Sequence, residues 1–462
     1  MKYPSPPRHW LQTAAMFLIV LMGLCPLLTA SGETTLYFEG SDKNSDAYQA
    51  FSSAHPELNV ETVSNIYLST TEIINALLTG EFPYDSYVMM SNSFDIQAMM
   101  DKGYCAGLNG SSLITEQIGL MYEPIQKLLS QDGQIYGAPF FCYIGYYAYD
   151  PVAWESAGLT AEDVPTSFEE LLDFLERWIE HIKNEPEEQI SVCNTFDSEL
   201  YGEHSYVSYL VDRLISNYIM QCNYASRPIR FDTPDFRSLL ERCQRIGKDL
   251  YRYEPEWKGE MALFNDQHGM RNLAYFIPLR MTAEEPMLIK AVLYVSFVNV
   301  RSEHQPLAVE YLEDRLTYTA LEDQAYLYRD AQPVEDPSYM QMIESAAKTV
   351  SALENRIENM DAETETLTKK DLEMQLEIEK QRYQQMAESE DRYLISPNDL
   401  RLYRAYGSCL YFQAPSIFDP ATENGENIRN LRDMFSTGVM PLDQFVQRIN
   451  ALAWMLESET GS

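Results

Sequence analysis

The sequence predicts an α/β protein of two lobes joined by crossing strands, with an added helical hairpin. The chain has 462 residues, which exceeds the size at which one hydrophobic core keeps growing, so two lobes are expected. Strands alternate with helices from Thr35 to Gly103, which indicates a mainly parallel sheet. The uncharged aromatic run within Gln134–Asp150 is too short to span a membrane and too rich in Tyr and Phe for a helix. We expect it to be a buried strand that crosses between the lobes, with a ligand against it.

The net charge of −36 excludes one class of partner. Nucleic-acid affinity comes mainly from Lys and Arg that neutralise phosphates, and here 70 acidic residues face only 34 basic ones. Two interpretations of the charge remain open: a solvated surface that keeps the chain soluble, and steering of a cationic ligand. The hydrophobic fraction of 45% is that of an ordinary globular protein.

The N-terminus has the pattern of a secretory signal peptide over residues 1–32. Lys2 and Arg8 precede an apolar run from Ala14 to Leu24, and small residues follow. The mature chain is therefore expected outside the cell or at the cell surface. Lipid attachment at Cys25 is not favoured, because a leucine precedes this cysteine and a proline follows it. The six cysteines beyond the leader form no Cys-x-x-Cys pair, so scattered thiols are expected rather than a zinc site.

The first lobe is expected to be a sheet covered by helices. Ligands of such sheets bind beyond the carboxyl ends of the strands, where the loops Gly40–Lys43 and Met90–Ser93 are predicted. The expected strands are Thr35–Phe38, Leu58–Val63 and Tyr84–Met89, and the expected helices are Ser45–Ser53, Thr70–Leu78 and a segment closed by Gly103.

Beyond Asp150 the pattern becomes more helical. Ser167 is a predicted N-cap with Glu170 three residues later, opening an amphipathic helix. Lys290–Val300 reads as a second crossing strand, and a third connection is expected near Tyr411–Pro415. The other expected helices are Pro151–Ala157, Tyr206–Met220, Pro234–Leu250, Gly259–Asn265, Gln305–Leu316, Pro397–Gly407 and Pro441–Leu456.

Residues 338–389 predict a helical hairpin. Apolar side chains from Ile343 to Met360 recur at alternating three- and four-residue steps, and Leu372 to Met386 resume this narrow seam after a polar turn. Each arm holds only about two heptads, which favours packing of the arms on each other, although an acidic hairpin that recruits a protein partner stays an alternative.

No catalytic motif is present. The sequence contains no G-x-S-x-G, H-E-x-x-H or P-loop, and its six histidines are scattered. This favours a binding protein without a metal or cofactor over an enzyme. Tyrosines cluster at Tyr143–Tyr149, Tyr201–Tyr209 and Tyr403–Phe412. A tyrosine ring can stack on a sugar while its hydroxyl forms hydrogen bonds, although core packing is the alternative for any single tyrosine.

Several motifs resemble a known family. Gly133-Gln-Ile-Tyr-Gly-Ala-Pro139 with Tyr149-Asp150 resembles the D-G-K-x-Y-G-x-P … Y-N signature of extracellular solute-binding proteins of ABC transporters. Val164-Pro-Thr-Ser-Phe-Glu-Glu-Leu171 is similar to the P-x-T-W-x-E-L of that family, although Phe168 replaces the tryptophan. Similar pieces occur in the same order at Pro83–Tyr104, Phe297–Leu312 and Gly438–Phe445. The 338–389 hairpin has no counterpart in the small members of that family.

The resemblance implies a two-lobed, type II periplasmic-binding-protein-like fold. Lobe 1 would comprise 33–139 plus about 300–337, and lobe 2 would comprise 140–299 plus about 390–462. The implied function, closest to the carbohydrate-binding branch, is capture of a sugar or oligosaccharide by hinge closure and its delivery, by a monomer, to a membrane permease. The ligand-contact candidates are Ser41, Asp42, Lys43, Ser91, Asn92, Phe141, Tyr143, Trp257 and Phe412. The alternatives are a secreted glycan-active enzyme and a surface module that uses the hairpin.

Overall fold

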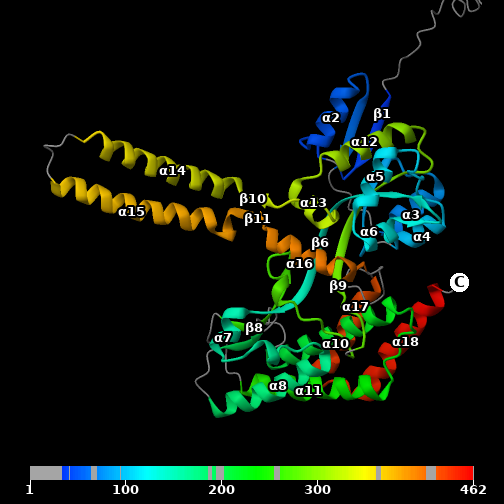
Figure 1. The fold of residues 1–462 in the computed structure, drawn as a ribbon. Coiled ribbons are helices and arrows are strands. Elements are labelled where there is room, and N and C mark those ends of the chain that lie inside the picture. Colours follow the sequence, from blue (N-terminus) through cyan, green and yellow to red (C-terminus); the bar gives the residue numbers. More distant parts are fainter. Residues whose placement is uncertain are drawn as a thin grey trace, which may run out of the picture.

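The structure is a computed structural model that describes residues 34–40, 42–63, 70–93, 95–185, 190–193, 202–253, 261–282, 284–360, 366–412 and 423–460. The expected signal peptide lies outside these residues. Two α/β lobes are stacked, and a long helical hairpin projects sideways from the region where they meet (Figure 1). The predicted architecture of two lobes, crossing strands and an added hairpin is therefore confirmed.

One eight-stranded sheet runs through both lobes in the order β2-β1-β3-β9-β6-β8-β7, with β12 paired to β9. The strands β1, β2 and β3 of lobe 1 are parallel, and β9 is inserted antiparallel between β3 and β6. The strand bounds are β1 Thr35–Glu39, β2 Asn59–Val63, β3 Ser86–Met90, β6 Gly137–Tyr149, β7 Ser191–Cys193, β8 Ala262–His268, β9 Ile289–Val298 and β12 Leu410–Phe412.

The strand β6 crosses between the lobes. Its first part, Gly137–Gly145, pairs with β9, and its last part, Gly145–Tyr149, pairs with β8 of lobe 2. Pro139 cannot donate to the ladder, and the register shifts between this proline and Phe141. The predictions of crossing strands near residues 139–149 and 290–300 are confirmed. The third connection is β12, while residues 413–415 of its predicted range lie outside the described residues.

Each lobe has its own core. In lobe 1, the stacked rings of Phe38 on β1 and Tyr311 on α12 lie 4.2 Å apart between centroids, with Phe51 of α2 at their edges. In lobe 2, the rings of Trp154 and Phe174 meet that of Phe264 on β8. The helices of lobe 1 are α2 Asp46–Ala54, α3 Thr70–Thr79, α4 Ile96–Asp101, α5 Ser112–Leu120, α6 Glu123–Leu129, α12 Gln305–Thr317 and α13 Leu321–Leu327.

The lobe 2 core is built from helices distant in sequence. The helices α10 and α11 pack together, and α17 and α18 from the C-terminal region close the core with Phe435 and Phe445. Burial of each such ring contributes about 2 to 3 kcal/mol to folding. The bounds are α7 Pro151–Ser156, α8 Phe168–Asn184, α10 Ser205–Tyr224, α11 Pro234–Tyr253, α17 Glu423–Ser436 and α18 Leu442–Thr460. No described helix combines the length and apolarity needed to cross a membrane.

Two expectations are wrong. The range 390–462 was assigned to lobe 2, yet α16 (Pro397–Tyr406) packs in the lobe 1 core. The hydroxyl of its Tyr403 donates to the Tyr326 carbonyl at 3.1 Å, and its ring meets that of Tyr122. Of the helix expected over 259–265, residues 259–260 lie outside the described residues, and the rest runs into β8, which pairs with β6 over 264–268 and with β7 at 262 and 264. Tertiary pairing overrides the local preference there.

The hairpin consists of α14 (Pro337–Glu358) and α15 (Thr366–Glu388). Its buried seam is short and includes Ile343, Leu353 and Leu372. Asp336 caps α14, and the two-stranded sheet of β10 (Val334–Glu335) and β11 (Tyr393–Ile395) closes the root. The hairpin therefore packs mainly on itself and extends away from both lobes (Figure 1).

Candidate ligand-binding site

The two crossing strands present opposite chemistry on their two faces. Because paired residues project to the same side, Tyr143 shares a face with Val292, and Gly145 shares it with Lys290. Cys142 and Ile144 project to the other side and are buried in the lobe 1 core. Tyr143 is 37% exposed, whereas Ile144 is fully buried, so the strand turns one aromatic side chain away from the core.

A cavity of about 430 Å³ opens on this exposed face, where the crossing strands enter lobe 2. Its size fits a small ligand such as a mono- or disaccharide. The lining combines tyrosines, aliphatic side chains and charged groups. It consists of Tyr143, Gly145, Tyr146, Tyr147, Asp212, Arg213, Ile215, Ser216, Asn217, Ile219, Met220, Asp266, His268, Phe276, Ile277, Leu279, Leu288, Lys290, Val292, Ile428 and Arg432.

Arg213 organises one wall of the cavity. Its guanidinium carbon lies 4.7 Å from the ring centre of Tyr147 and 4.9 Å from that of Tyr209, and it pairs with Asp266. Burial acts to lower the pKa of Arg213, but Tyr209 and Asp266 together raise it above its ordinary value. Burial also raises the pKa of Tyr147 and of Tyr209. The wall therefore holds a fixed cation beside neutral phenols.

A second ion pair joins Arg432 of α17 to Asp212 of α10. The two arginines are mostly buried, with side chains 20% and 16% exposed, while their carboxylate partners are more open to solvent. Planar, hydrogen-bonding side chains held in this way can donate to and accept from hydroxyl groups without further ordering.

Gly145 keeps the cavity open beside His268. A Cβ atom on this glycine would lie 3.3 Å from the His268 Nδ1 atom, which is a tight contact. A larger side chain at this position would project from the same face as Tyr143, beside His268 of β8.

Two of the predicted contact residues lie on the cavity face of the crossing strands. Tyr143 lines the cavity. Phe141 shares the face, but its ring packs edge-on against Tyr294 at 5.2 Å, closer to lobe 1. Phe412 does not lie on this face: it pairs with Ala291, so it projects to the opposite face and packs on the lobe 1 core. Its neighbour Tyr411 shares the face of Lys290 instead.

The lobe 1 candidates are not brought into this cavity. Ser91 is 2% exposed, and its hydroxyl accepts the backbone N–H of Leu293 at 3.0 Å. Lys43 pairs with Glu61 at 3.7 Å, and Asp42 accepts from the backbone N–H of Asn44. Asn92 is half-buried after β3. Ser41 and Trp257 lie outside the described residues.

Sequence reasoning missed the charged residues of the cavity, although a signal for them exists. Asp212 and Arg213 are the only charged residues in α10, and Lys290 is the only one in β9. Charges isolated in apolar elements need partners or a ligand. Among the described residues, no group of three or more His, Cys, Asp or Glu could hold a metal ion.

The carboxyl ends of β1 and β3 hold a separate, partly buried cluster in lobe 1. Glu39 accepts the backbone N–H of Val88, and Arg315 donates to the Gly40 carbonyl at 2.9 Å. The Arg315 guanidinium also lies 3.6 Å from the ring centre of Phe140. Burial raises the pKa of Glu39 and lowers that of Arg315. Through its contact with Phe140, Arg315 holds the crossing strand to the end of β1.

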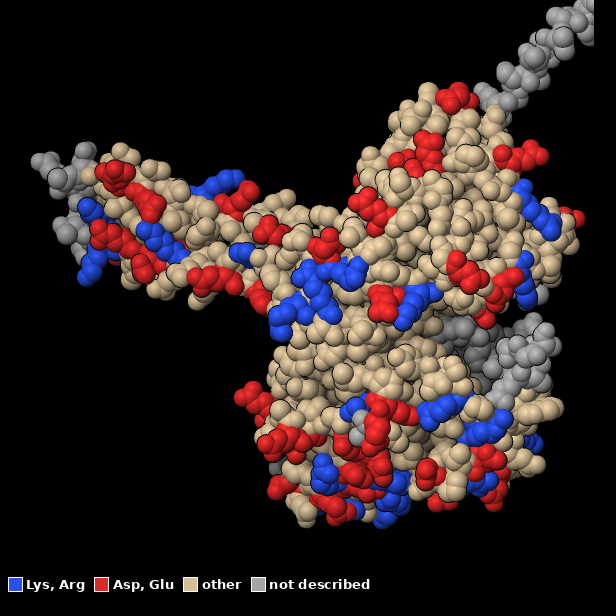
Figure 2. Space-filling model, turned by 45° about the vertical axis from the view of Figure 1, so that its right-hand side comes forward, with Lys and Arg blue, Asp and Glu red and all other residues tan. Residues whose placement is uncertain are grey.

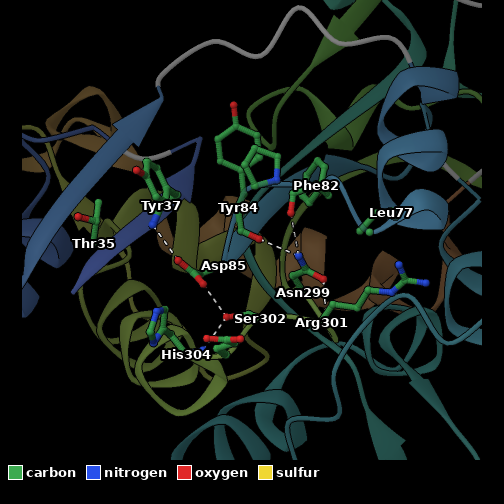
Figure 3. A pocket seen from close by; sticks show the side chains of 13 residues that line it. Thr35, Tyr37, Leu77, Phe82, Tyr84, Asp85, Asn299, Arg301, Ser302 and His304 are labelled. Carbon is green, nitrogen blue, oxygen red and sulfur yellow. Dashed lines mark hydrogen bonds between the residues drawn. The ribbon is translucent and has the colours of Figure 1, made fainter. Parts of the chain in front are cut away.

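A second cavity, of about 260 Å³, lies at the other end of the lobe 1 strands (Figure 3). Its central carboxylate, Asp85, accepts from the Tyr37 backbone N–H at 2.8 Å and from the Ser302 hydroxyl at 2.5 Å. The Asn299 amide donates to the Tyr84 carbonyl at 3.0 Å. Because these polar groups are already paired with one another and with the backbone, they join the strands. They leave few hydrogen-bond donors or acceptors for a ligand.

On the face shown in Figure 2, the surface charge is mixed. On the face in Figure 2, acidic side chains are spread over both lobes and the hairpin, with basic ones among them. Basic side chains gather where the hairpin meets the lobes (Figure 2). This distribution agrees with the interpretation of the net charge as a solvated surface.

No family model and no curated protein sequence matches the chain. Solved structures are similar to it along most of its length. One is a cyclic alpha-maltosyl-1,6-maltose binding protein from Arthrobacter globiformis, with 14% identity, a TM-score of 0.49 and coverage of 91% of this chain and 98% of that one. Another is a family 1 extracellular solute-binding protein from Bifidobacterium longum subsp. infantis, with 12% identity, a TM-score of 0.46 and coverage of 92% and 99%.

A third is an ABC substrate-binding protein from Listeria monocytogenes in complex with cycloalternan, with 10% identity, a TM-score of 0.45 and coverage of 93% and 99%.

Proposed function

We propose that this chain is a solute-binding protein that captures a sugar or oligosaccharide at the crossing strands. The observation that carries the proposal is the cavity of about 430 Å³ with Tyr143 exposed on its wall. A partly exposed tyrosine offers a flat apolar face for a sugar ring, and the nearby ion-paired arginines and aspartates offer hydrogen bonds to its hydroxyls.

Capture is proposed to involve movement of the lobes about the crossing strands. The cavity belongs to lobe 2 and to the strands that continue into lobe 1, so a ligand there lies beside the segments that would bend. The segment that follows β8 packs on the lobe 1 core through Met270 and Leu273, so lobe 2 is joined to lobe 1 there as well as by the crossing strands. A ligand that contacts both lobes would favour the closed state.

The remaining elements of the proposal rest on the sequence. The signal-peptide pattern supports export, and the family resemblance supports delivery of the ligand to a permease of an ABC transporter by a monomeric binding protein. The missing catalytic motifs support binding without turnover.

The test is binding of a saccharide panel to the mature chain, followed by titration calorimetry of each hit. A ligand that binds only the folded state raises its melting temperature. Tyr143→Ala is expected to weaken binding of the hit by about tenfold, and Tyr143→Phe by less, because stacking depends on the ring. Tyr318→Ala, which removes an exposed tyrosine of lobe 1 outside the cavity lining, is the matched control. Unchanged affinity in Tyr143→Ala would remove the cavity from the proposal.

A further inference from the structure

Both arginines that line the cavity are held by carboxylates. Arg213 is paired with Asp266, and Arg432 is paired with Asp212 and, at 3.3 Å, with Asp433. Among the described residues that line the cavity, Lys290 is the charged residue that remains, and His268 lies on the same lining. Within the part of the chain that the structure describes, no carboxylate lies within 4.0 Å of the Lys290 ammonium and no hydrogen bond to it is present. Lys290 is thus the lysine or arginine of the described lining that has no carboxylate in contact with it.

The position of Lys290 is built into the sheet. It pairs with Gly145 on one side and with Tyr411 on the other, which fixes its Cα on the cavity face beside the strand that carries Tyr143. Every other residue of β9 is uncharged, and the strand is buried on both sides except at Lys290 and, partly, at Tyr294. An ammonium on an otherwise apolar strand has no role in the core, since charged side chains are costly to bury there.

We infer that the saccharide bound here carries a negatively charged group, which the Lys290 ammonium receives while the tyrosines contact the ring; this inference rests on the proposed function. The net charge of −36 disfavours the approach of an anion, so an acidic sugar needs a local cation to be held. The alternative of a cationic ligand finds no support in this cavity, because both aspartates of its lining already pair with arginines.

The group could be a carboxylate, as in a uronic acid, or a phosphate. Both are strong acceptors for an ammonium, and a lysine recognises either one as a point charge. Matched pairs separate the sources: glucuronate and galacturonate against glucose and galactose, and glucose 6-phosphate against glucose.

The experiment measures affinities for these pairs by calorimetry on the mature chain and on Lys290→Met, Lys290→Arg and Lys348→Met. An acidic sugar is expected to bind at least tenfold more tightly than its neutral partner, the effect of about one charge-assisted hydrogen bond. The advantage should disappear in Lys290→Met, persist in Lys290→Arg, and fall as salt is raised. Lys348→Met makes the same change on the hairpin, where the lysine is 81% exposed, and should keep the advantage.

Equal affinity for acidic and neutral partners, or an advantage that survives Lys290→Met, overturns the inference and leaves the proposed function standing. Binding of no saccharide of either kind overturns both. Because Lys290 is exposed, all variants are expected to melt within a few degrees of the parent chain, which separates lost binding from lost folding.

Discussion

Arg213 on α10 lies over the ring of Tyr147 on the crossing strand, with 4.7 Å between the guanidinium carbon and the ring centre. The same side chain stacks on Tyr209 and pairs with Asp266 of β8. One residue thus ties a helix of lobe 2 to two neighbouring strands of the sheet, directly at the wall of the cavity. This arrangement makes the wall part of the lobe 2 core rather than a mobile loop.

Replacing Arg213 should therefore cost stability as well as binding. Arg213→Met is expected to lower the free energy of unfolding by about 2 kcal/mol, since it removes two cation–π contacts and one charged hydrogen bond. Urea unfolding measures this change. Arg237→Met removes the Arg237–Asp443 pair, whose carboxylate is 89% exposed, and should cost under about 1 kcal/mol. Equal losses in the two variants would contradict the role given to Arg213.

Two glycines of the crossing strand should respond differently to alanine. A Cβ at Gly137 would lie 2.5 Å from a Val295 methyl carbon and 3.0 Å from the Phe297 ring, inside the lobe 1 core. Gly137→Ala should thus destabilise the fold by about 1 to 3 kcal/mol through overpacking.

At Gly145 the new methyl group meets only the exposed His268 ring, so Gly145→Ala should keep its unfolding midpoint and lose affinity for the saccharide several-fold. Parallel urea unfolding and calorimetry on both variants check the contrast. A Gly145→Ala protein that binds normally would show that this part of the cavity stays empty when ligand is bound.

Removal of the hairpin should leave ligand binding intact. Residues 338–388 pack mainly on each other, and the cavity lining includes none of them. A chain with a short Gly-Ser linker in place of 338–388 is expected to bind its saccharide within threefold of the full chain, as measured by calorimetry. If affinity collapses while the circular dichroism spectrum shows the remaining fold, the hairpin takes part in capture.

The ion pair of His55 with Glu310 should make stability depend on pH. The His55 Nε2–H group donates a hydrogen bond to the Glu310 carboxylate at 2.9 Å, and this bond raises the pKa of His55 above its ordinary value of 6.5. The pair therefore stabilises the fold fully below pH 6.5, and the contribution is lost as the pH rises through the higher folded-state pKa.

The His55–Glu310 pair is expected to contribute under about 1 kcal/mol to the free energy of unfolding, since it is partly exposed. Urea midpoints of the parent chain and of His55→Gln between pH 5.5 and 8.5 measure it, and the difference between the two proteins should shrink as the pH rises. A difference that grows with pH would mean that His55 is stabilised in its neutral form.

The sequence predicts the architecture better than it predicts the site. The crossing strands follow from uninterrupted apolar and aromatic runs, and the hairpin follows from a seam at regular spacing. β8 was mistaken for a helix because its pairing with β6 is a long-range contact that no local pattern reveals.

Among the site residues, Tyr143 could be predicted because it sits on a recognisable strand. Phe412 could not be placed, since the face to which it projects depends on the register of β12 against β9. Arg432 approaches Asp212 only after α17 returns to lobe 2, about 220 residues later in the chain.

The late return of α17 and α18 to lobe 2 has a consequence for the kinetics of folding. Phe435, Phe445 and Ile449, all at most 1% exposed, complete a core whose other members begin near Tyr147. During synthesis from the N-terminus, lobe 2 cannot finish folding until nearly the last residue has emerged, whereas most contacts of the first sheet can form earlier. A ribosome stalled before α17 would present an open apolar surface that attracts chaperones or aggregates. The order of the chain thus makes lobe 2 the slow and vulnerable half of this protein.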